Sequence, residues 1–249
     1  STQHPHMARD LVARMLDVDK ESVRVVAPHV GGAFGGKAAI VSDHGAVALA
    51  AQRLDRPVKW VETRSEAMLS MQGRGQVQYA ELGLDSEGVI TGLRLHIIGE
   101  CGAYAGFGGS FAVGPTYTMA TGPYRVPRLQ YEGLGVMTNT APVGAFRGAG
   151  RPEAAALLER LMDVAAQETG LTPEELRRRN LLRPDDFPYQ TDTGASYDSG
   201  DYDAALDKLL EHIDPAEVAR ERGGELADVA RERGGEWATL ARKRGEEFA

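Results

Sequence analysis

Glycine is concentrated in one part of this chain, and this limits what the chain can fold into. Of the 249 residues 30 are glycine, and 22 of these lie between residues 31 and 150. Glycine loses more backbone entropy on folding than any other residue, so long regular elements are not expected to carry so many. We expect positive φ angles or close backbone approaches here, above all at residues 31–36, which hold four glycines.

The rest of the composition is that of a globular protein. Hydrophobic residues make up 42% of the chain and charged residues 26%, which excludes disorder throughout. The net charge of −8 argues against a nucleic-acid partner recognised by bulk electrostatics. The lone cysteine, Cys101, excludes a disulfide framework and a cysteine-based zinc site. No apolar run approaches about 18 residues, so we expect a cytoplasmic protein without a membrane span.

Hydrophobic periodicity predicts an α+β fold with a mixed β-sheet and packed helices. Strands are predicted at residues 23–26, 58–61, 76–84, 89–98 and 131–137, and helices at residues 7–16, 40–54, 152–170 and from 172 onward. The order strand, glycine loop, helix and strand over residues 23–61 places the first glycine cluster at a helix N-terminus. The turn at residues 85–88 joins two alternating strands into a hairpin.

The end of the chain has a different composition. Blocks of 11 residues repeat from residue 219, and 11 residues complete three helical turns. Glycine pairs within the blocks weaken such a helix by about 1 kcal/mol per glycine relative to alanine. We therefore predict two parts, a folded module over residues 1–213 and a charged helical tail over residues 214–249.

The first glycine motif covers residues 31–38 and has the spacing of a phosphate-binding P-loop without its chemistry. A P-loop ends in a hydroxyl that holds magnesium, whereas this motif ends in Ala38. The G-x-G-x-x-G spacing of a dinucleotide-binding loop is also absent. What remains is a set of backbone N–H groups suited to an anionic or oxo ligand, with Phe34 as an apolar wall. Nucleotide binding is kept as a third hypothesis.

The second glycine motif, GAFRGAGRPEA at residues 144–154, places an arginine between glycines just before a helix. Such an arginine can point a fixed cation into a pocket while the backbone approaches a ligand closely. Considered alone, Arg147 is interpreted as a surface or ion-pair residue. Glu153, one turn into the helix, is expected to stabilise the helix N-terminus.

Together the two motifs resemble the large, molybdopterin-binding subunit of the molybdenum hydroxylases, which include xanthine dehydrogenase, aldehyde oxidoreductase and aerobic carbon monoxide dehydrogenase. The resemblance runs from residue 1 to about residue 210 through VRVVAPHVGGAFGGK, the GAY at residues 102–104 and GAFRGAGRPEA. It implies the molybdopterin-binding domain type of α+β fold over residues 1–213. It also implies a molybdenum-bound molybdopterin, in its cytosine dinucleotide form, and partner subunits that carry iron–sulfur clusters and FAD.

The resemblance also implies roles for individual residues. Cofactor contacts are implied for both motifs, at Gly32, Phe34, Gly35, Gly36, Phe146, Arg147 and Gly148. Phe34 and Gly35 would contribute backbone contacts to the ligands of the metal. Arg147 would be the catalytic residue, beside the molybdenum and the substrate. No side chain of this chain is expected to ligate the metal.

Departures from the family pattern narrow the substrate. Purine-oxidising members carry a glutamate at the position of Ala38 and a phenylalanine at that of Ala149. Copper-containing carbon monoxide dehydrogenases carry a cysteine at the position of Gly148. The FRGAGR sequence is similar to the branch called form II carbon monoxide dehydrogenase. We therefore expect hydroxylation of an aldehyde or an N-heterocycle.

One expected motif is missing from these 249 residues. The catalytic glutamate of the family lies in a G-x-G-E motif, which does not occur here. We therefore expect a cofactor-binding module from the middle of a longer subunit, inactive by itself. The alternative hypothesis is a non-catalytic scaffold or assembly fragment that binds no cofactor.

Overall fold

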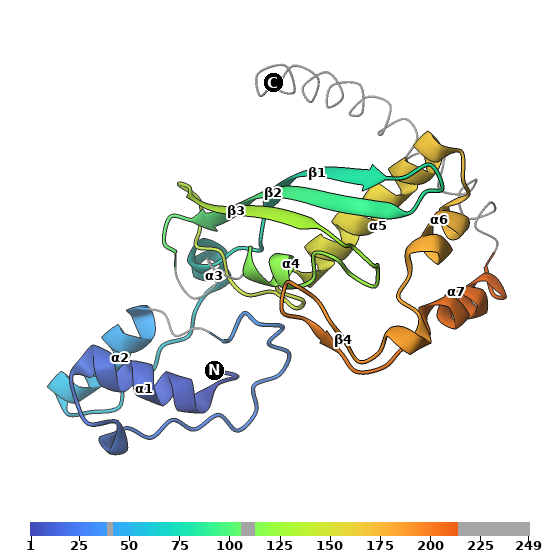
Figure 1. The fold of residues 1–249 in the computed structure, drawn as a ribbon. Helices are drawn as coiled ribbons and strands as arrows, with labels where there is room; N and C mark the ends of the chain where they lie inside the picture. The colour runs from blue at the N-terminus through green and yellow to red at the C-terminus, as the bar shows by residue number, and fades with distance from the viewer. Residues whose placement is uncertain (39–41, 106–112, 214–249) are drawn as a thin grey trace. The chain divides into compact units, whose positions relative to one another are not determined.

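The computed structural model describes residues 1–38, 42–105 and 113–213. Its contacts divide the chain into two units. The first contains residues 1–181 and 188–198, and the second contains residues 182–187 and the chain from Ser199 onward. The helical tail predicted at residues 214–249 lies outside the described residues. Figure 1 shows the arrangement of the elements along the chain.

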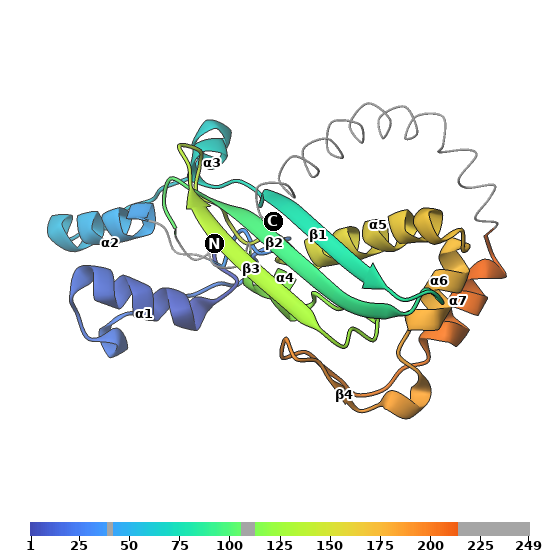
Figure 2. The same cartoon turned by 45° about the horizontal axis from the view of Figure 1, so that its top comes forward.

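A three-stranded mixed sheet forms the centre of the first unit. Its strands are β1 (Gln76–Leu84), β2 (Ile90–Gly102) and β3 (Leu129–Met137), in the order β1-β2-β3 (Figure 2). β1 and β2 pair antiparallel across the turn, and β2 and β3 pair parallel. The predicted hairpin and the predicted third strand are confirmed.

Helices pack on one face of this sheet. They are α4 (Gly114–Thr118), α5 (Arg151–Thr169) and α6 (Pro173–Asn180). Alternate residues of β2, Leu93, Leu95 and Ile97, are buried against Leu158 and Met162 of α5. Each such side chain contributes about 1.5–3 kcal/mol when fully buried. This core holds α5 against the sheet, and the second glycine motif leads directly into that helix.

The ends of α5 and α6 follow the sequence signals closely. Pro152 occupies the first turn of α5, and Gly170 ends that helix in the left-handed conformation, with φ 72°. Thr172 caps α6 by accepting a hydrogen bond from the Glu175 amide at 3.1 Å. The side chain of Asn180, 2% exposed, bonds the Ile90 amide and the Gly88 carbonyl, which joins α6 to the hairpin.

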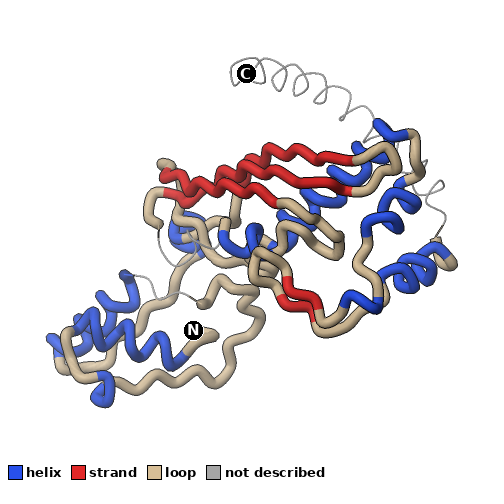
Figure 3. The backbone as a smooth tube through the Cα atoms, in the orientation of Figure 1, coloured by secondary structure: helices blue, strands red, loops and turns tan. Residues whose placement is uncertain are grey.

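The N-terminal part of the first unit is helical. It contains α1 (Pro5–Leu16), a short 3-10 helix η1 (Lys20–Ser22), α2 (Ser42–Leu54) and α3 (Arg64–Ser70). The strands predicted at residues 23–26 and 58–61 are wrong, because neither segment pairs with another strand. Val26 and Val61 are 66% and 68% exposed, so these β-branched runs lack the packing that makes a strand stable. The described backbone between η1 and α2 is drawn as loop in Figure 3.

The remaining elements are small. β4 (Tyr189–Gln190) and β5 (Ser196–Tyr197) form a two-stranded sheet in the first unit. The second unit contains the 3-10 helix η3 (Pro184–Asp186) and α7 (Tyr202–Leu210), and the rings of Phe187 and Tyr202 pack at 5.7 Å in it. Among the described helices, none combines the length and the hydropathy needed to cross a membrane.

Candidate functional site

The two glycine motifs touch each other in the folded chain. A Cβ atom added to Gly35 would lie 2.6 Å from the carbonyl oxygen of Ala145, a separation that real Cβ atoms do not show. Gly35 also has a φ of 99°, which side-chain-bearing residues rarely adopt. Glycine is therefore required at Gly35 by both the backbone conformation and the approach of the second loop.

Met71 packs against both motifs at the same junction. A Cβ atom on Gly36 would lie 3.0 Å from Cε of Met71, and one on Gly144 would overlap its sulfur atom. The next residue, Gln72, pairs with the second loop: its amide donates to the Pro142 carbonyl at 2.9 Å. Its own carbonyl accepts from the Gly144 amide, also at 2.9 Å. The segment after α3 therefore contacts both loops and is hydrogen-bonded to the second one.

The first motif forms a tight turn around Phe34. Phe34 has a φ of 52°, uncommon for a bulky residue, and its ring lies over Gly32. The Lys37 ammonium group donates to the Val30 carbonyl and so bridges the two ends of the motif. A P-loop lysine instead reaches the phosphates of a nucleotide. The structure therefore disfavours the nucleotide-binding hypothesis.

The second motif reverses the chain into α5. Gly148 has a φ of 97°, and a Cβ atom there would lie 2.5 Å from Cδ of Pro152. The Ala149 amide donates to the Phe146 carbonyl at 2.9 Å, which closes the turn. Ala149 has a φ of 48°, so each motif contains one residue with a side chain in the left-handed region. Such strained positions concentrate at functional sites.

Both motifs contain backbone N–H groups that have no partner within the described part of the chain. In the first motif these include the amides of residues 32–35, and in the second those of residues 146–148. Backbone amides pointing out of glycine-rich turns form concave sites for anions. The junction therefore carries two sets of hydrogen-bond donors.

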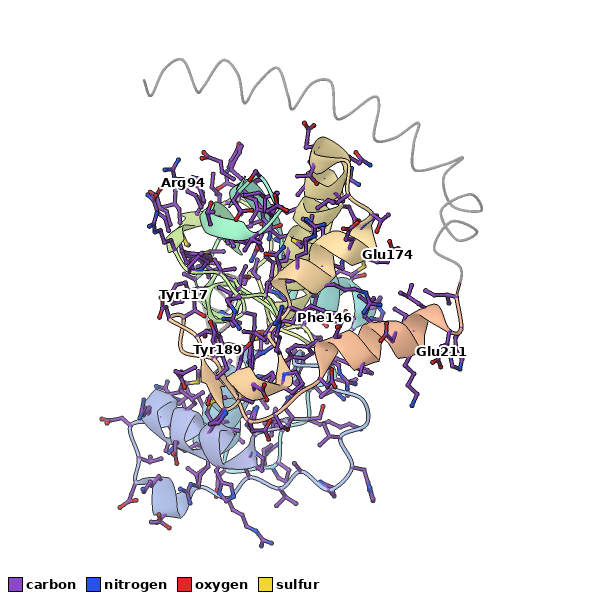
Figure 4. All side chains as sticks on the ribbon, turned by 45° about the vertical axis from the view of Figure 1, so that its right-hand side comes forward. Arg94, Tyr117, Phe146, Glu174, Tyr189 and Glu211 are labelled. Atoms are coloured by element: carbon purple, nitrogen blue, oxygen red, sulfur yellow. The ribbon has the colours of Figure 1, made fainter. Side chains whose placement is uncertain are left out.

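Beside the second motif lies an open cavity of about 410 Å³. Its walls are Gly73, Arg74, Phe146, Arg147, Pro152, Glu153 and Ala156. The ring of Phe146, labelled in Figure 4, is 60% exposed. The Arg147 guanidinium is exposed and makes no hydrogen bond or ion pair with any described residue. Arg147 therefore brings an uncompensated cation to an apolar cavity.

Arg74 and Glu153 form an ion pair in the wall of this cavity. Nε of Arg74 lies 2.7 Å from Oε1 of Glu153, and Nη1 donates to the Phe146 carbonyl at 2.7 Å. The Arg74 side chain is 4% exposed and that of Glu153 22%. The other carboxylate oxygen of Glu153 is buried and has no partner among the described residues. The sequence predicted only that Glu153 stabilises the N-terminus of α5, and its ion pair with Arg74 was not predicted.

A polar cluster fixes the loop that leads to the second motif. The Glu100 carboxylate, near the end of β2, accepts hydrogen bonds from the hydroxyls of Thr140 at 2.6 Å and Thr138 at 2.9 Å. The Gln72 side-chain amide donates to the Thr140 hydroxyl at 2.7 Å. The bonds from Thr140 and then Thr138 lower the pKa of Glu100.

The protein supplies no cluster of metal ligands in the described residues. No three histidine, cysteine, aspartate or glutamate side chains there lie close enough together to hold an ion. Cys101 lies in β2 and is 7% exposed, and its sulfur atom packs against Gly135 of the neighbouring strand β3.

The seven predicted site residues lie in three kinds of environment. Gly35 and Gly36 lie at the junction of the loops, whereas Gly32 and Gly148 pack against Phe34 and Pro152. Phe34, Phe146 and Arg147 are exposed. The role of each of these seven residues in holding a cofactor stays a prediction.

Comparison with known proteins gives a consistent result. The Molybdopterin cofactor-binding domain family matches residues 1–181. The carbon monoxide dehydrogenase large chain of Hydrogenophaga pseudoflava is 37% identical over 86% of this chain and 27% of its own length. The nicotine 6-hydroxylase large subunit of Paenarthrobacter nicotinovorans is 36% identical over 89% of this chain and 28% of its own length.

Comparison with a solved structure points to the same family. Quinoline 2-oxidoreductase from Pseudomonas putida 86 superposes with a TM-score of 0.82 at 32% identity, over 91% of this chain and 29% of that one. This likeness confirms the predicted α+β fold of the molybdopterin-binding type. The chain spans less than a third of the length of each of these three relatives. By the family match and these identities, the chain belongs to the molybdopterin cofactor-binding domain family of the molybdenum hydroxylases.

Proposed function

We propose that this chain holds a molybdenum-bound molybdopterin at the junction of its two glycine loops, as part of a hydroxylase. The observation that carries the proposal is the contact between Gly35 and Ala145, which places both sets of unpaired amides at one junction. Neutral N–H donors and the cation of Arg147, which no described residue neutralises, match the anionic and oxo groups of such a cofactor. The absence of a metal-ligand cluster in the described residues is compatible with a metal that its pterin ligates.

When bound, the cofactor supplies the two-electron redox centre at which a carbon–hydrogen bond is hydroxylated with oxygen from water. The amides at residues 32–35 and 146–148 hydrogen-bond to its anionic groups. Arg147 stabilises negative charge that develops on the substrate, because its cationic guanidinium has no competing partner among the described residues. The exposed rings of Phe34 and Phe146 exclude water and offer apolar surface to a flat substrate.

The substrate class that we propose is an aldehyde or an N-heterocycle. Two of the three relatives above are named for nicotine and quinoline, both N-heterocycles. The third acts on carbon monoxide by name. Gly148 stands here where copper-containing members of that group carry a cysteine, and the lone cysteine, Cys101, is buried within β2. Both observations favour the organic substrate.

We further propose that these 249 residues bind the cofactor without turning over substrate. They correspond to 27–29% of the length of the three relatives and contain no G-x-G-E motif. Turnover would then need further parts of a large subunit, together with subunits that carry iron–sulfur clusters and FAD. The cytosine dinucleotide form of the cofactor is part of the same proposal.

The test is the molybdenum and pterin content of the purified chain, produced in a host that makes the cofactor. We expect about one molybdenum and one pterin per chain, and no aldehyde oxidation. Arg147→Ala should lower the retained content, whereas Arg160→Ala, an exposed arginine further along α5, should not. A folded chain without metal or pterin would support the scaffold hypothesis and overturn the proposal. Aldehyde turnover by the chain alone would refute its inactivity.

A further inference from the structure

The Arg74–Glu153 pair contacts the backbone of the second glycine motif at the peptide just before the free cation. We infer that Arg74 and Glu153 are a positioning pair, which fixes the peptide between Phe146 and Arg147 and so aims the donors of the second loop. The inference rests on the proposed function for the identity of what those donors hold. It goes beyond that function by assigning a positioning role to Arg74, which lies outside both motifs, and to Glu153, which the sequence predicted only to stabilise the helix N-terminus.

The first step of the argument is the planar guanidinium of Arg74. It donates in two directions, through Nε to Glu153 and through Nη1 to the Phe146 carbonyl, both at 2.7 Å. Arg74 lies in the short segment between α3 and β1, and Glu153 lies in the first turn of α5. The Glu153 carbonyl accepts from the Gln78 side chain of β1 at 3.3 Å. The pair is therefore attached to the sheet and to the helix, which are the rigid elements around the loop.

The second step is the geometry of the peptide bond. A trans peptide is planar, and its C=O and N–H groups point in opposite directions. When Arg74 holds the Phe146 carbonyl, it therefore directs the Arg147 N–H away from itself. This N–H group is one of the unpaired donors of the second loop. The Ala149 amide binds the same carbonyl at 2.9 Å, so two donors define the orientation of the peptide.

The third step is charge. Glu153 balances the charge of Arg74, whose side chain is only 4% exposed, and so offsets part of the cost of burying that cation. The cavity is left with Arg147 as the one cation in its wall that no described residue neutralises. An ion pair on the open face of the sheet shows the contrast. Arg94 and Glu81 lie 2.8 Å apart there, with side chains 59% and 71% exposed, and they contact neither loop.

The experiment compares Arg74→Gln, Arg74→Lys and Glu153→Gln with the matched control Arg94→Gln in the full 249-residue chain. The first readout is amide hydrogen exchange without cofactor, resolved at Ala149 and at core residues of β2. Loss of a charge-assisted bond to the Phe146 carbonyl should speed exchange at Ala149 by about tenfold in Arg74→Gln, with β2 unchanged. Glu153→Gln keeps an oxygen that accepts from Nε, so its effect should be smaller. Arg74→Lys should fall between these two.

The second readout is molybdenum and pterin content at equal protein folding, as judged by the urea midpoint. We expect Arg74→Gln to retain less cofactor than the control variant and Arg74→Lys to restore part of it. If the wild-type chain binds no cofactor, the proposed function fails, and the exchange readout alone decides the positioning role. Unchanged exchange at Ala149, or equal acceleration of all amides, would overturn the inference. So would full cofactor retention by a folded Arg74→Gln chain.

Discussion

Substitution of Gly35 by alanine tests whether the two glycine loops touch. In the structure Gly35 has a φ of 99°, and an added Cβ atom would lie 2.6 Å from the Ala145 carbonyl oxygen and 2.9 Å from its carbonyl carbon. Both neighbouring atoms belong to the backbone and cannot rotate away. The loops would have to separate, or the turn at Phe34 would have to change.

Two other glycines provide matched controls in the same part of the chain. Gly31 has a φ of 67° but nothing within 4 Å of an added Cβ atom, so Gly31→Ala isolates the backbone strain. That strain costs about 1–2 kcal/mol. Gly73 has neither a positive φ nor a neighbour within 4 Å, so Gly73→Ala should be close to neutral. Overpacking of a fixed site adds about 1–3 kcal/mol, which is the expected excess of Gly35→Ala over Gly31→Ala.

The assay is urea unfolding of the three variants and the wild type, followed by far-UV circular dichroism. We expect the order Gly35→Ala, Gly31→Ala, Gly73→Ala from most to least destabilised. In a domain of this size about 1 kcal/mol lowers the Tm by about 2–4 °C, so calorimetry should resolve the differences. If Gly35→Ala costs no more than Gly31→Ala, the loops do not meet at Ala145 and the proposed site is wrong.

Three further substitutions test the scaffold around the site. Asn180→Ala should lower the free energy of unfolding by about 1–3 kcal/mol in urea denaturation, because it leaves the buried Ile90 amide without its acceptor; an unchanged midpoint would contradict this. Burial raises the pKa of Tyr131 to about 12, so the folded state holds that proton more tightly than the unfolded state, where the pKa is about 10. This stability is complete below pH about 10 and lost as the pH rises to about 12, so Tyr131→Phe should show a shallower loss than the wild type in alkaline thermal melts; equal slopes would refute the assignment. Arg177 bonds Glu159 at 2.7 Å, and Arg177→Met should cost about 1–3 kcal/mol by calorimetry, more than the exposed Arg94→Met; equal costs would count against this contact.

The parts of the fold that the sequence predicted correctly are those with local causes. The β1–β2 hairpin follows from strict alternation on both sides of a glycine-containing turn, and α6 begins where Thr172 can cap it. The strands expected at residues 23–26 and 58–61 had only β-branched composition in their favour. A strand needs a partner, and neither segment has one.

The two motifs of the site could be predicted from the sequence, but the contacts that bring them together could not. The glycine clusters and Arg147 stand out in the sequence, as does the family that carries them. The contact between Gly35 and Ala145 joins two distant segments, and no periodic pattern encodes it. Arg74 is 79 residues from Glu153, and both are ordinary charged residues in the sequence. Such long-range contacts depend on tertiary packing, here on the sheet and α5.

The most direct test of the proposed site is hydrogen exchange of the chain with and without bound molybdenum–molybdopterin dinucleotide. We expect the bound cofactor to slow exchange at the amides of residues 32–35 and 146–148, which have no partner among the described residues. Amides in the core of β2 should change little. Protection confined to one loop, or to residues away from both, would contradict binding at their junction.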